Sequence, residues 1–171
     1  MSESPNPKNR IAAGIAFLYD LLVVIGNHLQ SPLLFAIRFV WGIQLMQAGF
    51  GKLLNIETPI GYFTSLGIPF PVENAWLVSF TETFGGIFLA LGLLTRLTAI
   101  PLIINFIVAY LTTEQESLHK LLHLDTDDFF AAAPFLFLYT AIIVLAFGPG
   151  AFSLDYLISR WRNVAWKSAK L

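Results

Sequence analysis

The sequence has no cysteine and few charged residues, and each shortage excludes a class of function. Without cysteine the chain can form no disulfide, no thiolate metal site, no cysteine-ligated iron–sulfur cluster and no C-x-x-C redox pair. The basic residues do not gather on one segment and the net charge is −1, which argues against nucleic acid as a partner. Charged residues make up 12% of the chain, whereas a soluble domain has roughly 25%.

What the sequence has in place of charge is apolar surface, because hydrophobic residues make up 56% of it. A helix needs about 20 apolar residues to cross a bilayer, at 1.5 Å of rise per residue. Four segments approach or exceed that length: residues 32–54, 74–94, 97–112 and 129–147. We therefore predict an all-α membrane protein, a bundle of four transmembrane helices in contact with the lipid bilayer.

A fifth apolar stretch, residues 11–25, is shorter and carries Asp20 near its middle. It ends at the polar sequence Gly26-Asn27-His28. We interpret it as an interfacial helix that lies on the membrane surface. The alternative is a fifth span. The chain then divides into a polar N-terminus with this helix (residues 1–30), a transmembrane domain (31–157) and a basic, aromatic tail (158–171).

The placement of basic residues predicts the orientation of the four spans. Basic residues are enriched in the cytoplasmic flanks of membrane spans. With both termini in the cytoplasm, the inside holds seven of them and the outer loops hold two. The inner set is Lys8, Arg10, Arg96, Arg160, Arg162, Lys167 and Lys170, and the outer set is Lys52 and Lys120. We predict a multi-pass protein of the cell (inner) membrane with both termini cytoplasmic.

The first outer loop, residues 55–73, contains a predicted short helix that begins near Thr58-Pro59, because proline is favoured in the first turn of a helix. Tyr62, Phe63 and Phe70 give the loop an aromatic character that suits the outer interface of a membrane. We expect it to cover the bundle as a lid.

Arg38 and Glu82 are the ionisable residues inside the predicted spans. An ionised side chain at mid-bilayer costs at least about 2.5 to 3.5 kcal/mol, so such groups rarely face lipid and are candidates for function. Their backbones should lie about 10 Å apart along the membrane normal, a separation that two long side chains or a polar relay would bridge. Glu82 and Arg38 are therefore the candidate catalytic residues. The alternative is that they only hold the bundle in one register.

Candidate ligand-binding residues surround this pair. Small residues allow close helix packing, and the first span carries Gly42 and Gly49 while the second carries Gly85 and Gly86. The predicted binding site lies in the seam between these two helices. Its members are Gln44, Gln47, Lys52, Gly85 and Gly86.

His119, His123 and Asp127 follow one another at intervals of four in the third outer loop. On a helix these side chains would align and could bind a divalent metal. The segment fits a solvated loop equally well, and we expect no metal there. No histidine falls within the four predicted spans, which argues against a haem held by two histidines inside the bundle.

These same positions carry a resemblance to the DoxX family of small four-helix membrane proteins, over about residues 33–157. The resemblance includes Arg38, Gly42, Gly49 and Lys52; Leu66-Gly67-Ile68-Pro69 with Pro71 and Ala75; Glu82-Thr83-Phe84-Gly85-Gly86 and Leu91-Gly92-Leu93-Leu94-Thr95-Arg96; and Phe147-Gly148-Pro149-Gly150 with Ser153-Leu154-Asp155. Nothing carries over to the first 30 residues. One related branch is the membrane subunit of a thiosulfate to quinone oxidoreductase, and others are linked to oxidative stress protection or to maturation of metal-binding peptides.

The resemblance implies a membrane subunit of a quinone-linked redox system, and so possible membership of an oxidoreductase, by analogy only. Its expected partners are a redox protein or further copies of the chain. The residues are compatible, because a quinone requires an apolar slot with one or two hydrogen-bond donors. Two alternatives remain. One is a non-enzymatic scaffold or assembly factor that docks a partner protein; the other is a small-solute transporter, for which four short spans leave little room.

Overall fold

The computed structural model describes residues 7–168 of the chain, with side chains described for residues 14–162. Lys170 lies outside this range, as do the side chains of Lys8, Arg10 and Lys167, on which part of the orientation prediction rests. The described residues form helices and no strand, as predicted for an all-α protein. The helices are α1 (Pro7–Leu54), α2 (Glu57–Ser65), α3 (Pro71–Leu91), α4 (Thr95–Thr112), α5 (Gln115–Leu122), α6 (Asp127–Ala131), α7 (Pro134–Phe147) and α8 (Leu154–Ser168).

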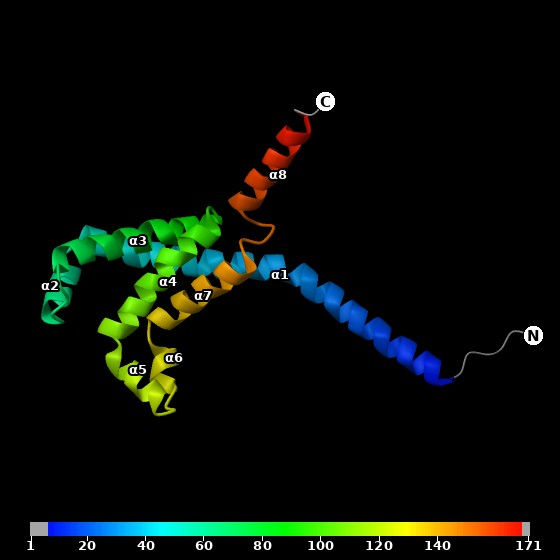
Figure 1. Ribbon diagram of the computed structural model, residues 1–171, viewed down its shortest axis with the longest axis horizontal. Coiled ribbons are helices and arrows are strands. Elements are labelled where there is room, and N and C mark those ends of the chain that lie inside the picture. The colour runs from blue at the N-terminus through cyan, green and yellow to red at the C-terminus, as the bar shows by residue number, and fades with distance from the viewer. Residues whose placement is uncertain (1–6, 169–171) are drawn as a thin grey trace, which may run out of the picture.

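The predicted N-terminal helix is continuous with the first predicted span. Both belong to α1, which runs for 48 residues and passes through Gly26-Asn27-His28, where the N-terminal helix was predicted to end. A single glycine inside a helix costs only about 1 kcal/mol, so Gly26 does not stop it. The helix also contains Pro32, and proline is a recognised cause of helix bending. Figure 1 shows α1 changing direction partway along, and its first part leaves the other helices. The helix predicted for residues 11–25 thus continues into the first predicted span without a break. The division of the chain near residue 30 and the placement of residues 11–25 on a membrane surface stay predictions.

The second part of α1 packs along α3 through the glycines that the sequence indicated. A Cβ added to Gly42 would lie 2.7 Å from the Ala90 backbone nitrogen, and one added to Gly86 would collide with the backbone of Met46. Only glycine permits helix axes to come this close. Pro71 begins α3 in its first turn, and Gly92 ends it with a φ of 67°, a left-handed conformation that favours glycine.

The predicted fourth span, residues 129–147, is interrupted. Ala132 is extended (φ −63°, ψ 137°), so α6 ends at Ala131 and α7 begins at Pro134. Proline removes a backbone donor and clashes with the preceding turn, which explains the break. The 14 residues of α7 pack against α4 and α1, and Leu45, Leu89, Leu102, Phe106, Ala141 and Val144 form the buried core there.

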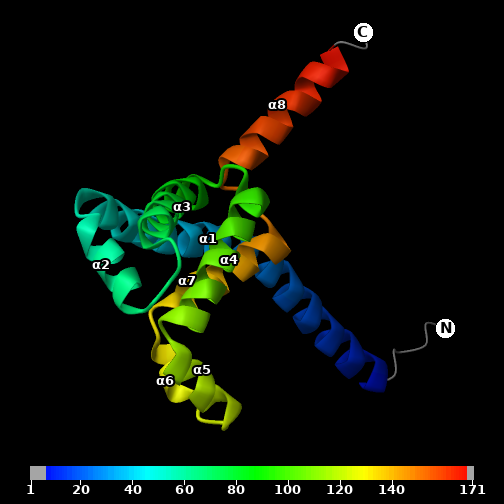
Figure 2. The same ribbon diagram turned by 60° about the vertical axis from the view of Figure 1, so that its left-hand side comes forward.

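Helices α1, α3, α4 and α7 thus form one packed body, which we call the helical body. Figures 1 and 2 show α2, α5 and α6 at one end of it and α8 leaving the other end. Among the described residues, two helical segments are long and apolar enough to cross a membrane, Gly14–Leu54 and Thr95–Thr112, and Pro134–Phe147 is apolar but shorter.

Candidate functional site

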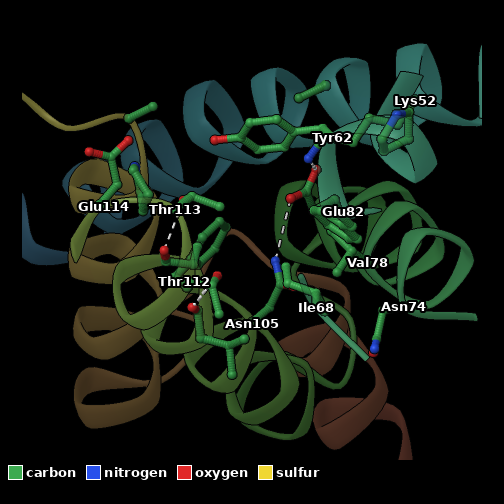
Figure 3. Close-up of a pocket in the computed structure, with 18 of the residues that line it drawn as sticks. Lys52, Tyr62, Ile68, Asn74, Val78, Glu82, Asn105, Thr112, Thr113 and Glu114 are labelled. Carbon is green, nitrogen blue, oxygen red and sulfur yellow. Dashed lines mark hydrogen bonds and ion pairs between the residues drawn. The ribbon is translucent and has the colours of Figure 1, made fainter. Parts of the chain in front are cut away.

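A cavity of about 670 Å³ opens at the end of the helical body that α2 covers (Figure 3). Helices α1, α3, α4 and α7 supply its walls, and α2 with the loop after it supplies a cover. Apolar side chains dominate the lining: Leu45, Pro59, Tyr62, Phe63, Ile68, Val78, Phe106, Val108 and Phe137. The cavity is therefore suited to an apolar or amphiphilic ligand.

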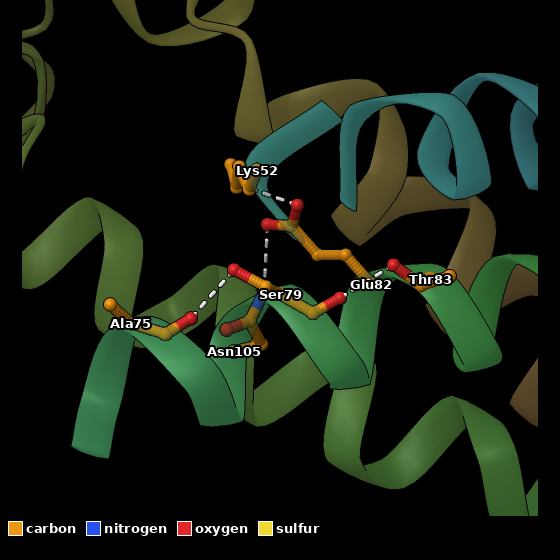
Figure 4. A network of polar contacts seen from close by, with 6 residues as sticks. All are labelled: Lys52, Ala75, Ser79, Glu82, Thr83 and Asn105. Atoms are coloured by element: carbon orange, nitrogen blue, oxygen red, sulfur yellow. Dashed lines mark hydrogen bonds and ion pairs between the residues drawn. The ribbon is translucent and has the colours of Figure 1, made fainter. Parts of the chain in front are cut away.

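Three polar side chains meet at one wall of the cavity. The Lys52 ammonium lies 2.6 Å from Oε2 of Glu82, and the Asn105 amide donates to Oε1 of Glu82 over 3.4 Å (Figure 4). They come from α1, α3 and α4 respectively. The Glu82 side chain is 7% exposed and that of Lys52 is 37% exposed. Lys52 therefore connects a buried carboxylate to the more open part of the cavity.

The helix packing brings Lys52 to Glu82. Gly49 lies nearly one turn before Lys52 in α1, and a Cβ added there would meet the Thr83 backbone nitrogen at 2.5 Å and the Glu82 Cβ at 2.8 Å. Nearby hydroxyls do not compete for the carboxylate, because Ser79 donates to the Ala75 carbonyl (2.6 Å) and Thr83 to the Ser79 carbonyl (2.7 Å). Glu82 is left to Lys52 and Asn105.

The cover over the cavity is the short helix predicted in the first outer loop. It spans Glu57–Ser65, and its Pro59, Tyr62 and Phe63 line the cavity. Gly67 follows with a φ of 68°, and the Ile68 backbone N–H then bonds the Phe63 carbonyl at 3.0 Å. This turn directs Ile68 and Pro69 back to the cavity rim.

Arg38, the other candidate catalytic residue, does not line this cavity. It is fully buried and donates to the Leu89 carbonyl (3.3 Å) and the Phe152 carbonyl (2.8 Å), while its Nε has no partner. No hydrogen bond or ion pair among the described residues joins Arg38 to Glu82, whose partners are Lys52 and Asn105. Arg38 instead ties α1 to the end of α3 and to the segment that precedes α8.

Asp155 completes this second polar cluster. It accepts from the backbone N–H groups of Leu94 (2.7 Å) and Thr95 (2.8 Å) and from the Thr95 hydroxyl (2.6 Å), and so caps α4. Burial acts to raise the pKa of Asp155, but these hydrogen bonds and the nearby Arg38 outweigh it, and the pKa is lowered. We call Arg38, Asp155 and the groups they bind the latch.

Four of the predicted ligand-binding residues lie outside the cavity lining. Gln44 and Gln47 are exposed on α1, on another face from Leu45 and Lys52. Gly85 and Gly86 are buried at helix contacts, where Cβ atoms would meet Leu102 and the α1 backbone. Of the predicted site residues, the structure brings together Lys52 and Glu82.

The three candidate metal ligands do not converge. The rings of His119 and His123 lie 4.9 Å apart on and just after α5, but the helix ends at Leu122 and Asp127 begins α6. No group of three potential ligands capable of holding a metal ion occurs in the described part of the chain. Instead Lys120 joins α5 to α6 through an ion pair with Asp128 (2.6 Å) and also pairs with Glu116 of its own helix (3.2 Å). The hydrogen bonds to Asp128 and Glu116 raise the Lys120 pKa.

Sequence reasoning missed Asn105 and the contribution of α4 to the site. An amide within the apolar run 97–112 was the available signal, but the predicted site was confined to the seam between the first two spans. Thr112, which ends α4, and Thr113 and Glu114, which follow it, also line the cavity (Figure 3).

Apolar helices around an amphiphilic cavity are the features of a helical membrane protein. The sequence profile of the DoxX family matches residues 33–115, which include Lys52, Glu82 and Asn105. The uncharacterized membrane protein Rv3486 of Mycobacterium tuberculosis is 30% identical over 135 residues, covering 75% of this chain and 83% of the relative. The chain belongs to the DoxX family of membrane proteins. No solved structure matches it.

Proposed function

We propose that the chain is the membrane subunit of a quinone-linked redox system and that the quinone binds in the cavity beside Lys52 and Glu82. The observation that carries the proposal is the polar wall of Lys52, Glu82 and Asn105 within an otherwise mostly apolar cavity. Its volume of about 670 Å³ falls within the range of small-molecule sites. Membership of the DoxX family, which is associated with membrane redox roles, supports the same assignment.

The polar wall matches the needs of a quinone head group. A quinone carbonyl accepts hydrogen bonds, and the Lys52 ammonium has three donors, of which Glu82 engages one. Conversion of a quinone to its quinol takes two electrons and two protons. In this proposal a partner redox protein supplies the electrons, Lys52 polarises a carbonyl, and Glu82 exchanges protons with the quinone. Arg38 has no place in this chemistry because it lies in the latch.

We also propose the membrane arrangement that this function requires. Helices α1 (from about Pro32), α3, α4 and α7 cross the cell membrane as a bundle, with both termini in the cytoplasm and α2, α5 and α6 on the outer side. The cavity then lies toward the outer leaflet, where a lipid-soluble quinone can reach it.

The proposal is tested by quinone binding to the purified chain in lipid nanodiscs, with a short-chain quinone as ligand. Ala109→Trp adds a large ring to a cavity-lining position of α4, whereas Ile104→Trp adds the same ring to an exposed position of the same helix. We expect at least a tenfold weaker affinity for Ala109→Trp and wild-type affinity for Ile104→Trp. Absence of binding to the wild type, or equal binding by both variants, would contradict the proposal.

A second candidate is a scaffold that docks a partner protein at the α5–α6 end. Leu122 and Leu124 are 77% and 91% exposed there, beside the acidic residues Asp125 and Asp127. Site-specific crosslinking from position 124 tests it. A dominant crosslinked partner that persists in Ala109→Trp would favour this function over quinone binding.

A further inference from the structure

Helix α8 presents an apolar face that no described part of the chain covers. Leu154, Leu157, Ile158 and Trp161 follow the three- and four-residue spacing of one helix face. They are 37% to 78% exposed, and Trp161 is the most exposed of them. Figures 1 and 2 agree that α8 leaves the helical body without packing on another helix.

Basic residues border this face on both sides. At 100° per residue, Arg160 and Arg162 project to opposite sides of Trp161, while Ser159 lies on the far face. Long arginine side chains in such positions can keep their guanidinium groups in the head-group layer while the apolar face enters the acyl region. The sequence adds Lys167 and Lys170 further along. The helix therefore combines an apolar face with positive charge.

The latch holds the start of α8 at one end of the helical body. The Asp155 backbone N–H bonds the Gly92 carbonyl at 3.0 Å, and the Asp155 carboxylate caps α4. At this end α3 stops, α4 begins and Arg96 is exposed. In a protein whose helical body spans a membrane, α8 thus begins at the membrane surface and is not free to drift away from it.

We propose that α8 lies on the membrane surface and binds anionic lipid, with Leu157, Ile158 and Trp161 in the acyl boundary and Arg160 and Arg162 at the phosphates. A lipid surface explains both features at once, because an amphipathic helix with basic flanks and an interfacial tryptophan is the pattern of in-plane membrane helices. The proposal does not depend on quinone binding.

The natural absence of cysteine makes the test direct, since each introduced cysteine is unique. The full chain carrying Leu157→Cys or Ile158→Cys, and Ser159→Cys as the matched control, is labelled with bimane in nanodiscs. The nanodiscs contain phosphatidylcholine with or without phosphatidylglycerol, and a doxyl-labelled lipid serves as quencher. We expect quenching at 157 and 158 at least threefold stronger than at 159 in the anionic discs. Changing both Arg160 and Arg162 to Gln should reduce that difference.

Equal, weak quenching at all three positions would overturn the proposal, because α8 would then project into water. Identical quenching with and without phosphatidylglycerol would overturn the anionic preference. A third outcome would be bimane spectra that change with the number of protein copies per disc and show no quenching by the lipid. It would mean that a second copy covers the apolar face of α8, and it would also overturn the proposal.

Discussion

Lys52 and Glu82 face unequal environments, so removing one partner should not cost the same as removing the other. Lys52→Met leaves the nearly buried Glu82 without a counter-charge, and breaking a buried pair in this way costs about 3–5 kcal/mol. Glu82→Gln leaves the more exposed Lys52, which can turn to the open part of the cavity, so we expect about 1 kcal/mol.

SDS-induced unfolding of the two variants and of the double variant measures these losses. A double variant that is more stable than Lys52→Met alone would confirm that the unpaired carboxylate causes the damage. Equal losses in the two single variants would contradict the asymmetry.

Arg38→Lys should weaken the fold without changing the cavity. A lysine cannot donate to the Leu89 and Phe152 carbonyls with the two-pronged geometry of a guanidinium, and each hydrogen bond to a charged group contributes about 1.5–3 kcal/mol. We expect a loss of about 2–3 kcal/mol in the free energy of unfolding and unchanged quinone affinity. If Arg38→Lys lost quinone affinity but kept wild-type stability, Arg38 would have to be counted among the residues of the binding site.

Asp155 should make stability depend on acid pH. Its pKa is lowered in the folded protein from the ordinary value of about 3.9, so its contribution is complete above that value and is lost as the pH falls through the folded pKa. Asp155→Asn removes the titrating group. We expect the free energy of unfolding of Asp155→Asn, measured between pH 6 and pH 3, to fall less steeply with decreasing pH than that of the wild type.

At the scale of helices, the α1–α3 contact makes a sharp prediction. Gly86→Ala places a methyl group against the α1 backbone, which cannot yield as a flexible side chain could, so we expect a loss of at least about 2 kcal/mol. Gly51→Ala, also in a helix, meets nothing within 4 Å and should be neutral or stabilising by up to about 1 kcal/mol. Thermal unfolding of both variants in detergent provides the comparison, and similar values would contradict the packing.

The helices that the sequence predicted best are those with a long apolar run and a clear stop. The apolar run of α3 ends at Gly92. The apolar run of α4 is marked at its start instead, because it begins directly after Arg96. Two predicted helix boundaries were wrong because they were inferred from hydropathy: the end of a helix at residues 26–28 and a continuous helix over residues 129–147. The polar residues Gly26-Asn27-His28 do not end α1, because they are compatible with helical backbone geometry. Pro134, in contrast, begins a new helix within an apolar run that hydropathy predicts as one span.

The site was predictable in part. The cost of a carboxylate in hydrocarbon singled out Glu82, and its position near Lys52 follows from one-dimensional spacing along two adjacent helices. Which other side chains face the cavity depends on how each helix is rotated about its axis, and residue spacing does not predict that rotation. Gln44 and Gln47 lie at the right depth on the wrong face of α1, and Asn105 comes from a helix that carries no charge within its apolar run.

For the whole molecule, the proposed topology places Leu124 and Ser159 on opposite sides of the membrane. Both are exposed, so a cysteine at either position is open to reagents. In intact cells a membrane-impermeant maleimide should label Leu124→Cys and not Ser159→Cys, while lysis should make both reactive. Labelling of both in intact cells would contradict four crossings.

The length of α1 also determines how closely neighbouring proteins can approach. The part of α1 before Pro32 contains about 25 residues and extends about 37 Å, and the 15 residues of α8 extend about 22 Å. Four packed helices of about 10 Å diameter are only about 20 to 25 Å across. The first part of α1 is therefore longer than the helical body is wide, and α8 is about as long as that width. With both segments on the membrane surface, as predicted for residues 11–25 and proposed for α8, neighbouring membrane proteins would meet them before they meet the helical body.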